Sequence, residues 1–90
     1  MICLNMIVKN ESKGIERLLK SVVPVVNSYC ICDTGSTDNT VEIITKFAEE
    51  HGWTGKIVYK PFVNFEVNRN YALEEARSLN PDYILLMDAD

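Results

Sequence analysis

The acidic residues that could bind a cation or the hydroxyl groups of a ligand stand just after apolar segments of this sequence. These four carboxylates are Glu11, Asp33, Asp88 and Asp90. Mg²⁺ and Mn²⁺ prefer oxygen ligands and often take one or two carboxylates together with the phosphates of a substrate. Like charges gathered in a cleft repel one another unless a cation or ligand donors compensate for them. The pattern therefore predicts a site for Mn²⁺ or Mg²⁺, or for a ligand with several donors.

The segment Asp88-Ala89-Asp90 forms a D-x-D motif. Two carboxylates separated by one residue can share a divalent ion, or one can bind the ion while the other accepts a hydrogen bond from a ligand hydroxyl. So short a motif often arises by chance. This one directly follows an apolar run at 84–87, which is typical of a buried strand, and that position favours a functional interpretation.

Asp33, Gly35 and Arg69 predict contacts with a nucleotide. A carboxylate at the end of a strand, such as Asp33, can accept a hydrogen bond from a base N–H or a ribose hydroxyl. Gly35 allows the backbone to approach a ligand closely, and Arg69 can reach a phosphate or pair with an acid of the cleft. The sequence contains no G-x-G-x-x-G motif and no P-loop, which argues against a dinucleotide-binding protein or a P-loop NTPase.

The elements that must position these residues follow from the apolar pattern, in which continuous runs alternate with helical stripes. Continuous runs of four to eight residues are typical of strands buried on both faces, and spacings of three and four residues are typical of amphipathic helices. We predict strands at 2–8, 29–32, 56–60 and 83–87, and helices at 15–22, 41–48 and 66–79. The alternation predicts an α/β fold with three α/β/α layers around a mainly parallel four-stranded sheet. In such sheets ligands bind beyond the carboxyl ends of the strands, where the acids are expected.

Residues that favour helix ends border these predicted helices. Ser12 is the predicted N-cap of the first helix, and Asn39 with Glu42 has the spacing of a capping box for the second. Asp38 is also interpreted as a cap of the second helix, and His51 is expected at its carboxyl end.

Composition narrows the class of protein further. The 90 residues suit a single domain, and 9 basic against 13 acidic residues give a net charge of −4. An acidic chain is a poor partner for nucleic acid or an anionic membrane surface. No apolar run approaches the roughly 20 residues of a membrane span, and we expect no signal peptide. Three cysteines within apolar runs are interpreted as small buried hydrophobic residues of a cytoplasmic protein.

Four blocks in order, CLNMIVKNE, CDTGSTDNT, NRNYALEEA and YILLMDAD, resemble the start of a family 2 glycosyltransferase. The resemblance covers the whole chain and implies a Rossmann-like GT-A half-domain that binds a nucleotide-sugar donor, with UDP as the usual nucleotide. The residues that it implies for the donor are Ile7, Val8, Asn10, Glu11, Asp33, Gly35, Arg69, Asp88 and Ala89. Those that it implies for the metal are Asp88 and Asp90, the latter meeting the ion that bridges the diphosphate.

The family pattern also differs from this chain in two respects. Many relatives read DDGS where this sequence has Asp33-Thr34-Gly35-Ser36, so one acid near the base is missing. The family continues past the D-x-D motif with an acceptor-binding half that carries the general base. Residues 1–90 are therefore expected to form the donor-binding domain alone, truncated after the motif and without a catalytic base. We also expect an exposed strand edge with apolar surface and, as a result, a homo-oligomer.

Two other functions fit the sequence. One is a binding module that holds a nucleotide or sugar without chemistry, or a fragment that needs a partner for its acceptor half. The other is a phospho-acceptor or phosphatase-like α/β domain, which Asp33 with Thr34 and Ser36 matches loosely.

Overall fold

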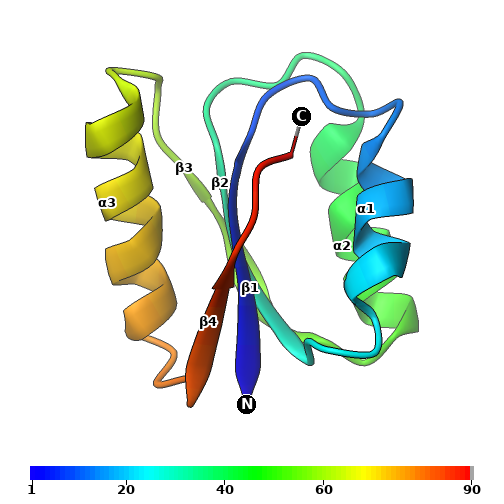
Figure 1. The fold of residues 1–90 in the computed structure, drawn as a ribbon. Coiled ribbons are helices and arrows are strands. Elements are labelled where there is room, and N and C mark those ends of the chain that lie inside the picture. Colours follow the sequence, from blue (N-terminus) through cyan, green and yellow to red (C-terminus); the bar gives the residue numbers. More distant parts are fainter. Residues whose placement is uncertain (90) are drawn as a thin grey trace.

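The computed structural model describes residues 1–89 and shows a parallel sheet between two layers of helices (Figure 1). The elements in chain order are β1 (Ile2–Val8), α1 (Ile15–Val22), β2 (Ser28–Asp33), α2 (Thr40–Glu50), β3 (Thr54–Tyr59), α3 (Phe65–Arg77) and β4 (Tyr83–Leu86). All strand pairs are parallel, in the order β3-β2-β1-β4. Helices α1 and α2 cover one face of the sheet and α3 covers the other (Figure 1). The predicted three-layer α/β fold is confirmed.

The order of the strands places a switch point between β1 and β4. From β1 the chain moves outward through β2 to β3, and it then returns through α3 to the opposite side of β1. Strand β4 pairs with only the first part of β1, from Ile2 opposite Tyr83 to Asn5 opposite Leu86. Beyond Asn5, β1 continues beside β2 alone. Open α/β sheets bind ligands at such a reversal, at the carboxyl ends of the strands.

Strand β1 is buried on both faces because each face packs against a helical layer. Leu4 and Met6 belong to the core that α1 and α2 cover, and Cys3 belongs to the core under α3. Cys30 and Cys32 also lie under α3, and all three thiols are fully buried. Their interpretation as small buried hydrophobic residues is confirmed. Desolvation raises the pKa of the Cys30 thiol to about 11, so this group stays protonated at neutral pH.

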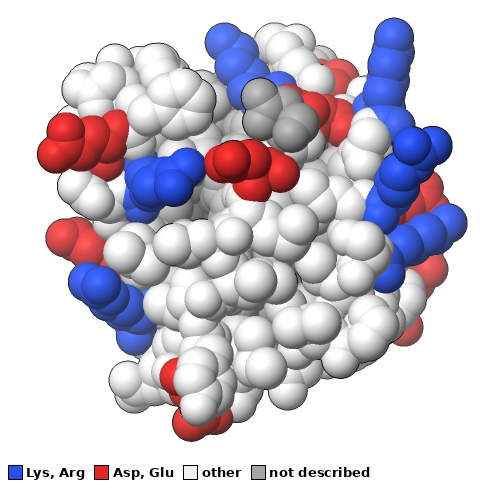
Figure 2. Space-filling model, in the orientation of Figure 1, with Lys and Arg blue, Asp and Glu red and all other residues white. Residues whose placement is uncertain are grey.

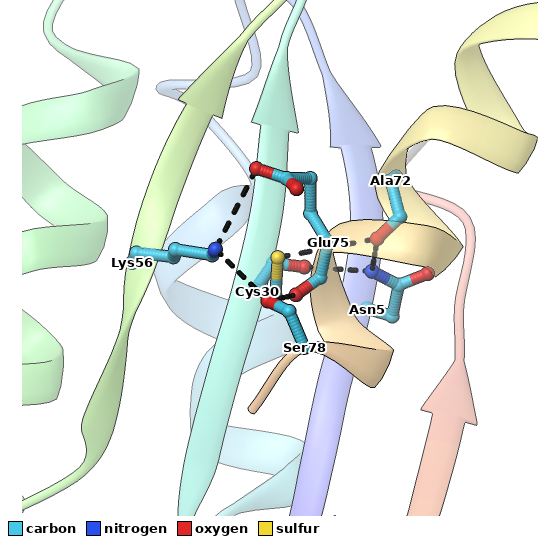
Figure 3. A network of polar contacts seen from close by, with 6 residues as sticks. All are labelled: Asn5, Cys30, Lys56, Ala72, Glu75 and Ser78. Atoms are coloured by element: carbon cyan, nitrogen blue, oxygen red, sulfur yellow. Dashed lines mark hydrogen bonds and ion pairs between the residues drawn. The ribbon is translucent and has the colours of Figure 1, made fainter. Parts of the chain in front are cut away.

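Polar contacts tie α3 to its face of the sheet (Figure 3). The side-chain amide of Asn5, buried in β1, donates to the carbonyl oxygens of Cys30 at 2.9 Å and Ala72 at 3.0 Å. On the next strands, Lys56 of β3 pairs with Glu75 of α3 at 3.5 Å. These contacts set the position of α3, whose amino-terminal end stands at the carboxyl edge of the sheet.

The predicted N-cap of α1 is wrong, and so is the predicted capping box of α2. Ser12 does not cap α1, whose N-cap position is Gly14, because the Glu11 carbonyl accepts from the N–H groups of Gly14 and Ile15 and forms a turn there. The Ser12 N–H instead donates to Asp38.

At the start of α2, Asn39 holds the N-cap position without a side-chain bond, so the capping box is also absent. Asp38 takes that role, since its Oδ1 accepts from the Thr40 N–H at 3.0 Å and from the Thr40 hydroxyl. His51 lies at the carboxyl end of α2, as predicted.

Strand β4 forms one edge of the sheet. Its Tyr83 and Leu86 side chains are 71% and 50% exposed, as expected for an uncovered strand edge with apolar surface. Self-association through this edge stays a prediction. Within residues 1–89, none of the helices combines the length and the apolar character that crossing a bilayer requires.

Candidate functional site

A cavity of about 430 Å³ opens at the switch point, where the chain after β4 separates from β1. The last bond between them runs from the Met87 N–H to the Asn5 carbonyl at 3.2 Å. The end of β1, residues 87–89 and the start of α3 then form the walls. The residues of the predicted donor site that line this cavity are Ile7, Val8, Glu11, Arg69, Asp88 and Ala89.

Arg69 and Asp88 meet across the mouth of this cavity. Their Nη2 and Oδ1 atoms lie 3.2 Å apart, and the two side chains are 51% and 72% exposed. Figure 2 shows blue and red atoms side by side in the upper half of this face, above a broad uncharged area. An exposed pair of this kind adds little to stability, about 0–1 kcal/mol. Its guanidinium has further N–H donors that suit a phosphate, so a ligand can compete for it at low cost.

Asp33 is a buried carboxylate with one unused oxygen. The side chain is only 4% exposed, and its Oδ2 accepts from the N–H groups of Gly35 at 3.1 Å and Ser36 at 3.0 Å. Its Oδ1 has no hydrogen-bond partner among residues 1–89. Buried polar atoms without a partner are rare and costly, which makes this oxygen a candidate acceptor for a ligand donor. The positive φ of 130° at Gly35 permits the turn that brings both N–H groups to Oδ2.

Asp33 and Gly35 line a second, smaller hollow of about 130 Å³. Thr34 lines both this hollow and the larger cavity, so the two adjoin at the end of β2. Tyr59 and Lys60, at the end of β3, also line the smaller hollow. Thr34 therefore stands between the cavity beside Arg69 and the hollow beside Asp33.

Asn10 organises the loop beside the site and does not line either hollow. Its Oδ1 accepts from the N–H groups of Thr37 at 2.8 Å and Asp38 at 3.3 Å, and its own N–H donates to the Ser36 hydroxyl at 3.0 Å. The residue has a positive φ of 51°, a conformation that asparagine tolerates better than most residues. Its direct contact with a donor stays a prediction.

The carboxylate of Asp38 also belongs to this loop. The Thr40 hydroxyl, the Thr40 N–H and the Ser12 N–H bond to its charged form and lower its pKa to about 2. The side chain is exposed, and it serves as a cap of α2 and not as part of the cavity wall.

Several residues of the cavity wall were not predicted from the sequence, and two of them are aromatic. Phe62 and Phe65 line the cavity next to Arg69. Asn68 is fully buried behind them and bonds to the loop that carries Phe62. One signal for Asn68 was available, because it stands four residues before Ala72 and eight before Ala76, on the buried stripe of α3. The aromatic residues carried no such periodic signal.

Among the described residues, two carboxylates line the cavity, those of Glu11 and Asp88. Among residues 1–89, no three side chains of histidine, cysteine, aspartate or glutamate lie close enough together to form a metal site. Asp88 lies at the cavity, and Asp90, the other predicted ligand, falls outside the described residues. One or two carboxylates fit Mg²⁺ or Mn²⁺ when substrate phosphates complete the coordination, and they do not fit a metal site built from protein ligands alone.

The chain is an α/β protein with a cavity at the switch point of a parallel sheet, the place where open α/β sheets bind ligands. Comparison with known proteins identifies the family. A model of glycosyl transferase family 2 matches residues 3–90, and the chain belongs to this family.

Relatives support this assignment. The chain is 37% identical over 84 residues to an uncharacterized glycosyltransferase of Rickettsia felis, covering 93% of this chain and 26% of the relative. It is 33% identical over 87 residues to a poly-β-1,6-N-acetyl-D-glucosamine synthase of Staphylococcus epidermidis, covering 90% of this chain and 19% of the relative. The chain thus spans about a quarter or less of the length of these relatives.

Proposed function

We propose that this chain binds the nucleoside-diphosphate sugar donor of a glycosyl transfer reaction, with UDP as the nucleotide. The observation that supports this most strongly is the Oδ1 of buried Asp33, which has no partner among the described residues. Asp33 lines a hollow that shares Thr34 with the switch-point cavity, which Arg69 and Asp88 border. A nucleoside diphosphate carries donor groups on its base and ribose and negative charge on its phosphates. Asp33, at one end of this site, can accept hydrogen bonds from the base or ribose, and Arg69, at the other end, can bind the phosphates.

Each residue of the site has a role in this proposal. Asp33 accepts a hydrogen bond from the base or the ribose, and the Arg69 guanidinium binds a phosphate. Apolar side chains of β1 form the wall behind the nucleoside, and Gly35 and Asn10 hold the loop that presents Asp33. Glu11 and the 88–89 backbone border the ribose and the sugar.

A divalent cation, Mn²⁺ or Mg²⁺, belongs to the proposal as a partner of the diphosphate. Asp88 would hold it, with Asp90 as the second candidate ligand. When bound, such an ion neutralises charge that develops on the leaving nucleoside diphosphate. Transfer also requires a base that deprotonates the acceptor hydroxyl. We assign none of the described residues to that role, so the proposal for this chain is donor binding.

Calorimetric titration tests donor binding. UDP is titrated into the chain with Mn²⁺ and again with EDTA, and the variant Asp33→Asn is compared with Asp82→Asn. In Asp33→Asn, the amide oxygen of the new side chain can still accept from the loop N–H groups, but its amide nitrogen then replaces Oδ1 and cannot accept from a ligand. Asp82 is an exposed acid at the amino end of β4 and provides the same chemical change far from the cavity.

We expect metal-dependent binding of UDP that Asp33→Asn weakens at least about tenfold, the scale of one lost charge-assisted hydrogen bond. The Asp82→Asn variant should bind as the parent chain does. No binding of UDP, GDP or dTDP in the presence of Mn²⁺ would refute the proposed function. Donor hydrolysis or transfer by the chain would exclude a pure binding module.

A further inference from the structure

Two phenylalanine rings form an aromatic pair at the rim of the cavity. The rings of Phe62 and Phe65 pack edge to face, with centroids 5.6 Å apart and planes at 84°. Both line the cavity, yet they are 52% and 68% exposed. Phe65 begins α3, and Arg69 follows four residues later, so the two share one face of the helix a single turn apart. The aromatic pair therefore stands next to the cation of the site.

The loop that carries this pair is held in place by two asparagines. The fully buried Asn68 accepts from the Val63 N–H at 2.8 Å through its Oδ1. Its amide donates to the carbonyl oxygens of Lys60 and Pro61, both at 3.3 Å. Asn64 caps α3 by accepting from the Val67 N–H at 2.8 Å. These four hydrogen bonds fix the loop, yet its two large apolar rings are exposed to solvent. Such an arrangement is typical of a preorganised binding surface.

The same loop begins beside Asp33. The Lys60 N–H donates to the Asp33 carbonyl at 3.1 Å, and Lys60 and Pro61 line the hollow that contains Asp33. Phe62 follows directly after them. Along the chain, the aromatic pair thus lies between the contact to Asp33 and the cation of Arg69.

We propose that the nucleobase of the donor packs against this aromatic pair, stacking on the face of one ring while the perpendicular ring contacts its edge. The base edge then lies toward Asp33 and the phosphates toward Arg69. This inference rests on the proposed function and deepens it. An aromatic face stacks on any nucleobase without hydrogen bonds. A hexose instead presents hydroxyl groups that need polar partners when they are buried. On α3, the first polar residue after Phe65 that lines the cavity is Arg69, which favours the base over the sugar.

Calorimetry with stacking-deficient variants tests the inference. UDP and UDP-N-acetylglucosamine are titrated with Mn²⁺ into the parent chain, Phe62→Leu, Phe65→Leu and Phe65→Trp. Tyr83→Leu is the matched control, because Tyr83 is an exposed aromatic residue on the edge strand β4. Thermal melts show that each variant is folded. Both leucine variants should weaken UDP binding about tenfold, the scale of one lost base–aromatic contact. Phe65→Trp, which keeps an aromatic face, should bind UDP more tightly than Phe65→Leu does, and Tyr83→Leu should bind UDP as the parent chain does.

A second measurement does not depend on any variant. With UDP and Mg²⁺, nuclear Overhauser effects should join the H5 and H6 protons of uracil to the ring protons of Phe62 or Phe65. Their absence in a saturated complex would overturn the inference, and so would unchanged UDP affinity in both leucine variants. Weakening that appears only with UDP-N-acetylglucosamine would place the sugar on the rings and overturn it as well. If the parent chain binds no nucleotide, the proposed function fails first and the inference fails with it.

Discussion

Replacement of Asn68 by alanine should destabilise the chain more than any other single change at the rim of the cavity. The substitution removes a 2.8 Å bond to the Val63 N–H and two 3.3 Å bonds to the carbonyl oxygens of Lys60 and Pro61. With about 1 kcal/mol for the short bond and about 0.5–1 kcal/mol for each longer one, the free energy of unfolding should fall by about 2–3 kcal/mol. A 90-residue domain has on the order of 5–13 kcal/mol in total.

Urea unfolding followed by circular dichroism measures this loss, and thermal melts should show Tm lower by about 10–20 °C. Asn64→Ala is the matched control, because it removes one capping bond from the same loop at a cost of about 1 kcal/mol. The reasoning is refuted if Asn68→Ala loses no more stability than Asn64→Ala does.

Three further predictions concern other groups of the chain. Because the pair of Arg69 with Asp88 is exposed, Arg69→Ala should change the free energy of unfolding in urea by less than about 1 kcal/mol. The affinity of this variant for UDP, measured by calorimetry, should fall. The carboxyl of Asp38 should titrate near pH 2 by NMR, and the variant Thr40→Val should raise its pKa toward 3.8. Because folding lowers this pKa, the stability that Asp38 contributes is present above pH 3.8 and is lost as the pH falls through 2. Cys30, whose pKa burial raises to about 11, should resist iodoacetamide at pH 8 in the folded chain and react once urea unfolds it.

Much of the fold was predictable because its signals are local. Every strand and helix lies within two residues of the range predicted from apolar runs and stripes. The layering also followed, since strands that alternate with helices leave little choice but a parallel sheet. The strand order did not follow, because it depends on which side of β1 the chain takes after α3. The exact place of the cavity depends on that order.

The caps show where local spacing misleads. Ser12 has a suitable side chain and precedes an apolar stripe, but the turn at Glu11 moves the start of α1 beyond its reach. Asn39 and Glu42 have the right spacing for a capping box, but the side chain of Asn39 makes no cap bond, and Asp38 accepts from the Thr40 N–H in the first turn. In both cases the choice depends on loop geometry that the spacing of residues does not contain.

Some residues of the candidate site could be predicted from the sequence, and others depend on loop geometry. Glu11, Arg69 and Asp88 were predictable because the carboxyl ends of parallel strands, and the helices between them, meet at one edge of the sheet. The free Oδ1 of Asp33 could not be predicted, because it depends on how the loop N–H groups bond to the other carboxylate oxygen. The exposed position of Phe62 likewise depends on how Asn68 holds the loop.

The central claim is that a nucleoside diphosphate binds in the cavity at the switch point between β1 and β4. Two-dimensional ¹H–¹⁵N NMR of the chain, titrated with UDP and Mg²⁺, tests it most directly. We predict that the largest shifts of backbone amide signals occur at Val8, Thr34, Arg69 and Asp88, which line the cavity. No change is expected at the exposed Val25, which lies in the connection between α1 and the amino end of β2. Shifts that cluster away from these residues, or no shifts at millimolar UDP, would contradict the account.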